Sequence, residues 1–214
     1  MKITKLGHCC LLIETKEKRI LTDPGAFSVA SHKDVNNIDI ILITHEHADH
    51  LHTESLQEIL SNNPEAKVFT NTSVNKLLQE LAINSEILEG RETLESHGIL
   101  LEAFDAKHEE IFEEIGQVQN TGYFIDNKLF YPGDAFCNPE KPVDILALPV
   151  AGPWCRVTDA INYALLIKPR AAFPVHDGML QEDKIGGSHA IPEKVLTENG
   201  IEFVRMVEDG VLEG

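Results

Sequence analysis

Short apolar runs bounded by turn residues dominate the first half of the chain, and this pattern predicts strands. The expected strands are 2–6, 9–14, 19–22, 38–44, 67–70, 87–88, 92–95 and 99–106. Apolar residues at helical spacing interrupt them in two places. One expected helix covers 54–61, and His52 is expected to help open it. A second begins with Ser73 as its N-cap and carries Val74, Leu77, Leu78 and Leu81 on one face.

The second half repeats the alternation of strands and helices. Asp126-Asn127 between runs 122–125 and 128–131 predicts a hairpin. Further strands are expected at 143–149, 171–175 and 201–207. One helix is expected from the cap Thr158 to the residue before Pro169, and another with Pro192 in its first turn, ending near Gly200. We therefore expect one domain, residues 1–214, of mixed α/β (α+β) class, with two packed sheets covered outside by helices.

Composition supports a compact domain without a membrane segment. The chain has 214 residues, of which 43% are hydrophobic. It has no apolar run long enough for a membrane span, and its first residues lack the apolar stretch of a signal peptide. The cysteines are Cys9, Cys10, Cys137 and Cys155, without a CxxC pair. A reduced, cytoplasmic protein is the simplest interpretation.

Net charge limits the partners. The formal charge of −17 would repel phosphate backbones, and no cluster of Lys or Arg relieves it. We therefore expect no nucleic-acid partner and a small-molecule substrate. A small anionic substrate is left open, because a metal centre dominates its own local field. Whether the chain forms a homo-oligomer is left open.

A cluster of imidazoles and carboxylates follows the apolar run 38–42. His45, His47, Asp49 and His50 lie within six residues, spaced His-x-His-x-Asp-His. Neutral imidazoles and a carboxylate are preferred ligands of a borderline divalent ion such as zinc. His45 and His47 point the same way on an extended backbone, whereas Asp49 and His50 follow where the chain must turn. The cluster therefore predicts a metal site, with room for a second ion.

Three more polar residues each end an apolar run beside small or turn residues. They are His108, Asp134 and His176. Each is weak evidence alone, because a single histidine is more often a surface or hydrogen-bonded residue. Together with the first cluster they favour a joint metal site at one edge of a sheet.

These motifs resemble the metallo-β-lactamase superfamily. Asp23 in Leu-Thr-Asp-Pro matches the first motif, the histidine cluster the second, and His108, Asp134 and His176 the remaining three. The resemblance spans nearly the whole chain and implies a four-layer αββα sandwich with the site along one edge. The opening Leu-Gly-His-Cys-Cys-Leu-Leu-Ile-Glu, residues 6–14, resembles the L-ascorbate-6-phosphate lactonase-like zinc-dependent hydrolases, although Cys9 stands where relatives usually have Ser.

The resemblance also implies a division of ligands between two ions. His45, His47 and His108 would bind one ion, Asp49, His50 and His176 the other, and Asp134 would bridge them. The ions are expected to be zinc, with manganese or iron as alternatives. A hydroxide between them would attack the substrate, which gives Asp49 and Asp134 a catalytic part.

Four further residues have two interpretations each. His8 and His189 are catalytic candidates. His8 could line the pocket or only pair with a strand-end carbonyl, and His189 could contact substrate, act as an acid or be a solvated loop residue. His189 is expected on a loop. Asp23 would orient a ligand histidine or serve only as a turn residue. Trp154, the sole tryptophan, could form a pocket wall or a core contact.

The sequence therefore predicts a metal-dependent hydrolase of a small ester, lactone or phosphodiester. The alternative is a metal-bearing binding or redox module, since some relatives hold iron and pass electrons. A nuclease is a third option, which the negative charge disfavours.

Overall fold

The computed structural model describes residues 1–181 and 185–214. One sheet, in the order β14-β1-β2-β3-β4-β5-β6, is built mostly from the first half of the chain. Its strands are β1 (Lys2–Gly7), β2 (Cys10–Thr15), β3 (Lys18–Thr22), β4 (Ile40–Leu42), β5 (Lys67–Thr70), β6 (Glu86–Ile87) and β14 (Val211–Glu213). The pairs from β3 to β6 are parallel, so their carboxyl ends meet at one edge.

The second sheet has the order β13-β12-β11-β10-β9-β8-β7. Its strands are β7 (Thr93–Ser96), β8 (Ile99–Lys107), β9 (Gln119–Ile125), β10 (Leu129–Tyr131), β11 (Ile145–Pro149), β12 (Ala171–Val175) and β13 (Glu202–Phe203). β9 and β10 form the predicted hairpin, and both Asp126 and Asn127 have positive φ, as its tight turn requires. The pairs from β10 to β13 are parallel.

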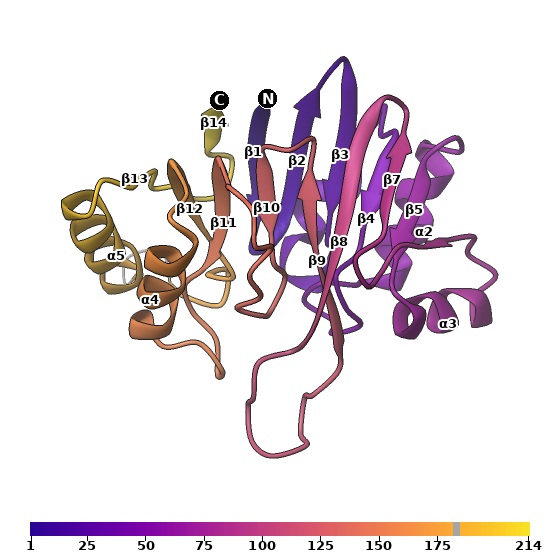
Figure 1. Cartoon of the computed structure of the whole chain (residues 1–214). Coiled ribbons are helices and arrows are strands. Elements are labelled where there is room, and N and C mark those ends of the chain that lie inside the picture. Colours follow the sequence, from indigo (N-terminus) through magenta and orange to yellow (C-terminus); the bar gives the residue numbers. More distant parts are fainter. Residues whose placement is uncertain (182–184) are drawn as a thin grey trace.

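Three apolar clusters define the layers of the fold. The central cluster combines residues of both sheets, such as Ile13 and Leu42 from the first and Leu101 and Phe173 from the second. The outer faces are covered by α2 (Thr53–Asn62) and α3 (Thr72–Glu80) on one side and by α4 (Val157–Ile167) and α5 (Gly186–Glu198) on the other. Figure 1 shows the helix pairs on opposite sides of the sheets. The predicted αββα arrangement is confirmed.

Several helix boundaries differ from the prediction. Asn71, not Ser73, caps α3 by accepting from the Val74 N–H, and α4 begins after Arg156 rather than after Thr158. The other difference is larger: α5 begins at Gly186, so Pro192 lies inside the helix and His189 is helical. Gly186 and Gly187 have low helix propensity, which favoured a loop. His52 does cap α2, as expected.

Two short segments were not anticipated. Residues Ala26–Ser28 form a 3₁₀ turn that continues into α1 (Val29–His32), and β14 pairs antiparallel with β1. The predicted strand 201–207 is reduced to β13. Among the described residues, no helix is both long enough and apolar enough to cross a membrane.

Candidate metal centre

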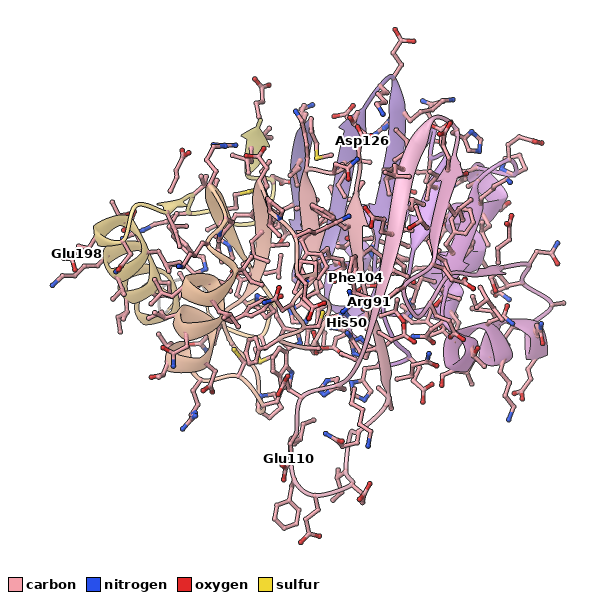
Figure 2. All side chains as sticks on the ribbon, viewed as in Figure 1. His50, Arg91, Phe104, Glu110, Asp126 and Glu198 are labelled. Carbon is pink, nitrogen blue, oxygen red and sulfur yellow. The ribbon has the colours of Figure 1, made fainter. Side chains whose placement is uncertain are left out.

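All seven predicted ligand residues come together at one edge of the two sheets. His45, His47, Asp49 and His50 lie in the segment between β4 and α2, and the other three follow β8, β10 and β12. Figure 2 labels His50 in the lower part of the sheets. The edge unites residues from both sheets because the strand before each ligand segment, β4, β8, β10 or β12, ends there.

The ligand atoms form two adjacent groups. One ligand atom from each of His45, His47 and His108 lies within 4.8 Å of the others. The same limit holds for a second group, which contains Asp49, His50, Asp134 and His176. Each group therefore offers at least three donors of the kinds that divalent ions bind.

Asp134 lies between the two groups. Its Oδ2 atom is 3.2 Å from His108 Nε2 and 2.8 Å from His176 Nε2, and its Oδ1 atom is 3.1 Å from His50 Nε2. One carboxylate thus reaches histidines of both groups. This position suits a residue that bridges two ions.

The donor atoms themselves indicate that a cation belongs here. Nε2 of His45, His50 and His176 and Oδ1 of Asp134 are buried and make no hydrogen bond within the described chain. Buried polar atoms are rarely left without a partner, and such an exception needs an explanation. Divalent ions among these converging lone pairs would satisfy all four atoms, so the residues fit the predicted metals.

Electrostatics at the site favour binding of positive charge. Burial lowers the pKa of His45 well below its ordinary value. Burial also acts to lower the pKa of His50 and of His176. Nearby anionic groups, of which Asp134 has the largest effect, outweigh burial, so the pKa of both imidazoles is raised. Burial opposes a charge on Asp134, yet His50 and His176 hold its pKa well below the usual range. Without a metal, protons on His50 and His176 therefore balance the buried carboxylate.

Asp23 orients His50. The Asp23 Oδ2 atom is 2.7 Å from His50 Nδ1, and it also accepts hydrogen bonds from Thr44 Oγ1 at 2.6 Å and from the Tyr131 hydroxyl at 2.5 Å. Its Oδ1 atom accepts the Thr44 N–H. Because a carboxylate only accepts, His50 must donate from Nδ1 and leave Nε2 free for a metal. The orienting interpretation of Asp23 is favoured over a simple turn residue.

Backbone carbonyls orient two other histidines. His108 Nδ1 lies 2.7 Å from the Glu109 carbonyl oxygen, and His176 Nδ1 lies 2.7 Å from the Ala151 carbonyl oxygen. Each carbonyl can only accept, so each ring donates from Nδ1. Both Nε2 atoms are then free to face the ions.

Asn120 and two glycines also shape the site, and sequence reasoning missed them. Asn120 Oδ1 accepts the Asp134 N–H at 3.0 Å, while its Nδ2 donates to the Pro132 carbonyl oxygen. Gly133 has φ +64°, and a Cβ there would lie 2.3 Å from Asn120 Oδ1. A Cβ at Gly25 would lie 1.8 Å from the Asp49 carbonyl oxygen. The glycines therefore allow loops to pack closely around the ligands. Gly133 immediately before Asp134 was the available signal.

His8 contacts the predicted ligand Asp49 and also lines a separate pocket of about 210 Å³. Its Nδ1 atom accepts the Gly178 N–H at 3.1 Å, so its proton is on Nε2, which lies 3.1 Å from Asp49 Oδ2. Burial lowers its pKa to about 4, against a raising effect from Asp49. A Cβ at Gly178 would come within 2.9 Å of His8 Cβ. His8 thus holds Asp49 as a neutral hydrogen-bond donor.

Cys9 lies close to the second group. Its Sγ atom and nitrogen atoms of His8, His50 and His176 lie within 4.8 Å of one another. Cys9 is buried and is also part of the central apolar cluster. A polarisable sulfur therefore lies next to His8, His50 and His176.

The structure does not bring His189 to the ligand groups. His189 Nε2 lies 2.8 Å from Asp177 Oδ2, and Asp177 Oδ1 lies 2.6 Å from Lys5 Nζ. Lys5 also donates to the carbonyl oxygens of Pro174 and Met206. These buried groups link α5 to β1 beside His176. The sequence could not reveal this network, because its members are far apart in the chain.

An open cleft of about 290 Å³ leads to the ligands. Trp154 forms part of its wall, with ring centroids 5.6 Å from His108 and 5.2 Å from His176. The indole also belongs to the apolar cluster under α4. Trp154 therefore combines both roles that its position in the sequence suggested.

Comparison with known proteins agrees with the site. The model of the beta-lactamase superfamily domain matches residues 2–176. Protein Rv0786c of Mycobacterium tuberculosis is 31% identical over 195 residues, covering 87% of this chain and 88% of that protein. A UPF0173 metal-dependent hydrolase of Thermoplasma volcanium is 28% identical, covering 82% of this chain and 83% of its own.

Solved structures show the same fold. A protein of Parabacteroides distasonis superposes with a TM-score of 0.79 at 25% identity, covering 97% of this chain and 93% of its own. Igni18, a metallo hydrolase of Ignicoccus hospitalis, gives a TM-score of 0.77 at 18% identity, covering 99% of this chain and 97% of its own. By the match of the family model over most of its length, this chain belongs to the metallo-β-lactamase superfamily, whose relatives here include metal-dependent hydrolases.

Proposed function

We propose that the protein is a metal-dependent hydrolase with two divalent ions, zinc first, that cleaves a small ester, lactone or phosphodiester. The main support is the convergence of seven ligand side chains, of which His45, His50, His176 and Asp134 each have a buried donor atom without a hydrogen bond in the described chain. When bound, two ions supply a hydroxide at neutral pH and polarise the bond to be cleaved.

The protein residues have distinct parts in this proposal. Asp134 lies between the two ligand groups and would bridge the ions. Asp23 fixes the ring orientation of His50, and His8 donates a hydrogen bond to Asp49. His8 has no second proton to give at neutral pH, because its pKa is about 4. We therefore propose that His8 positions a ligand and does not protonate a leaving group. His189, bonded to Asp177, is given a structural part.

A redox or binding module is the second candidate. CmlA, a diiron β-hydroxylase of Streptomyces venezuelae, shares the fold with a TM-score of 0.74 at 18% identity. This chain covers 53% of CmlA, which is therefore much longer. A fold can host unrelated chemistry, so this likeness alone decides nothing. Histidines at positions 50 and 176 favour zinc hydrolysis over a carboxylate-rich iron site.

Other expectations stay predictions from the sequence. These are the single domain, the cytoplasmic location, the absence of nucleic-acid and membrane partners and the lactonase-like subgroup, and the oligomeric state stays open. A nuclease stays the least favoured activity because of the net charge of −17.

The test combines metal analysis with turnover. Protein purified without added metal is analysed for bound elements, then loaded with zinc, manganese or iron and assayed on esters, lactones and phosphodiesters. We expect two ions per chain and metal-dependent hydrolysis of at least one class. One ion or none under metal-replete conditions, or no hydrolysis by any loaded form, would contradict the proposal.

A further inference from the structure

The walls of the cleft contrast sharply with its floor. The floor consists of proposed ligands, namely His47, Asp49, His108, Asp134 and His176. Every other described residue that lines the cleft is apolar: Phe27, Ile111, Pro153, Trp154 and Met179. The described lining therefore contains no Lys or Arg, and no hydroxyl or amide side chain.

Three of these wall residues expose an unusual amount of apolar surface. Phe27 is 54% exposed, Met179 42% and Ile111 36%. They come from three separate segments, after β3, after β12 and after β8. Large apolar side chains that gather from different loops around a polar floor are typical of a ligand site rather than of scattered surface residues.

The surroundings of the cleft are acidic. Ile111 belongs to the segment between β8 and β9, which extends beyond the sheet edge in Figure 1. Exposed carboxylates at Glu110, Glu113 and Glu114 lie on the same segment, and Figure 2 shows Glu110 on it, below His50. Lys107 precedes the segment but does not line the cleft. These carboxylates would disfavour the approach of an anion along this side of the cleft.

We propose that the cleft accepts an uncharged acyl compound, an ester or lactone with a small apolar acyl group, in preference to phosphodiesters or phosphorylated sugars. This inference rests on the proposed hydrolase function and narrows its substrate class. The volume of about 290 Å³ suits a small molecule. A sugar would lose most of its hydrogen bonds to water against these walls, because among the described wall side chains the Trp154 indole N–H is the only strong hydrogen-bond donor.

The reaction needs no co-reactant except water. The water oxygen bonds to the acyl carbon, the bond from that carbon to the leaving oxygen breaks, and the leaving oxygen takes a proton from the water. A lactone opens to one hydroxy acid, whereas an ester yields an acid and an alcohol.

Binding can be measured separately from turnover, because Trp154 is the sole tryptophan and forms part of the wall. Zinc-loaded protein is titrated with aceto-, butyro- and hexanohydroxamic acid, which are uncharged in solution at neutral pH and lose a proton on binding zinc, and with phenyl phosphate, using tryptophan fluorescence. We expect the dissociation constant to fall by up to about fourfold for each methylene buried. Phenyl phosphate should bind at least tenfold more weakly than hexanohydroxamic acid.

Variants test whether the walls cause this preference. In Phe27→Ala and in Met179→Ala, the dissociation constant should fall less with each added methylene than it does in the unchanged protein. Leu166→Ala serves as the matched control, because Leu166 is 62% exposed on α4 and does not line the cleft. A dissociation constant independent of chain length, or tighter binding of phenyl phosphate, would overturn the inference.

Turnover separates the two proposals. The kcat/KM of p-nitrophenyl butyrate is compared with those of mono-p-nitrophenyl succinate, which adds a carboxylate, and bis-p-nitrophenyl phosphate. A preference of at least tenfold for the neutral ester supports the inference, and a preference for either anion overturns it. If no substrate turns over but the hydroxamates show the expected binding, hydrolysis fails while the ligand class of the cleft is supported.

Discussion

Asp23 Oδ2 lies 2.7 Å from His50 Nδ1, and the opposite nitrogen of that ring lies 3.1 Å from Asp134 Oδ1. The imidazole therefore connects a buried carboxylate on one side with the proposed bridging carboxylate on the other. Asp23 follows β3, and Asp134 follows β10 of the other sheet. The ring orientation at the metal centre thus depends on the packing of two sheets.

Replacing Asp23 by asparagine should weaken the second metal site. Asp23 accepts from four donors, and either orientation of an amide would place its NH₂ group against at least one of them. We expect the affinity for the ion at the site that contains His50 to fall about 10- to 100-fold. Competition with a chromogenic chelator measures it.

Asp39→Asn provides the matched control. Asp39 also accepts from a backbone N–H, that of Arg19, and from Lys18 Nζ, but it lies just before β4, away from the site. Metal affinity should be unchanged in that variant. Equal losses in the two variants would show that Asp23 acts through general stability rather than through His50.

Replacing Asp134 by asparagine should abolish most turnover. The amide keeps the size of the side chain but removes the negative charge between the two ligand groups. We expect kcat/KM on any confirmed substrate to fall at least about a hundredfold. Circular dichroism should show a retained fold.

The control for this prediction is Asp105→Asn on β8. Asp105 Oδ1 accepts from Thr121 Oγ1 at 2.7 Å, and the residue is not among the proposed ligands. Activity should persist in it. Full activity of the Asp134 variant would refute the bridging assignment.

Metal binding should release protons at neutral pH. The raised pKa values of His50 and His176 mean that both rings carry protons in the metal-free protein at pH 7, whereas metal ligands must be neutral. Their protonation stabilises the metal-free fold fully below pH ~6.5, and this contribution is lost as pH rises through the raised values. Metal affinity should therefore increase with pH.

Calorimetric titration with zinc in two buffers of different ionisation enthalpy measures the protons released. We also expect turnover to decline on the acid side as ligands and hydroxide are protonated. Zinc binding without proton release between pH 6 and 8, or a rate that stays flat down to about pH 5, would contradict this account.

Replacing Lys5 by methionine should destabilise the protein strongly. The ammonium group is buried and lies 2.6 Å from Asp177 Oδ1, so its removal leaves a buried carboxylate that keeps its bond to His189 but loses its buried cation. We expect a loss of about 3–5 kcal/mol in the free energy of unfolding. Urea denaturation of the metal-free protein measures it.

Lys16→Met is the matched comparison. Lys16 is paired with Asp126 at 2.5 Å, but its side chain is 55% exposed. An exposed pair contributes at most about 1 kcal/mol. If both variants lost the same stability, the proposed structural part of the network with His189 would be wrong.

The sequence predicted what local patterns encode. Apolar periodicity located most strands, because buried strands need continuous or alternating apolar residues. The cluster from His45 to His50 was evident because its ligands are neighbours in the chain. The order of the motifs then suggested that His108, Asp134 and His176 would join them, and the structure brings them together.

The remaining features depend on contacts between distant segments. Nothing near Asn120 indicates that its amide holds the backbone of Asp134, and nothing near Phe27 or Met179 places them in one cleft. The Gly-Gly-Ser-His segment looked like a loop, because local propensity cannot account for the bond from His189 to Asp177. Tertiary contacts decided these cases.

The distribution of the ligands over both sheets has a consequence for unfolding. Residues 45–50 follow a strand of one sheet, whereas His108, Asp134 and His176 follow strands of the other. Bound ions would therefore cross-link His47 to His108 and His50 to His176, residues that are far apart in the chain, and closing such long loops restricts the unfolded chain. The sheets could not separate at this edge without releasing the ions, so metal occupancy should slow unfolding as well as oppose it at equilibrium.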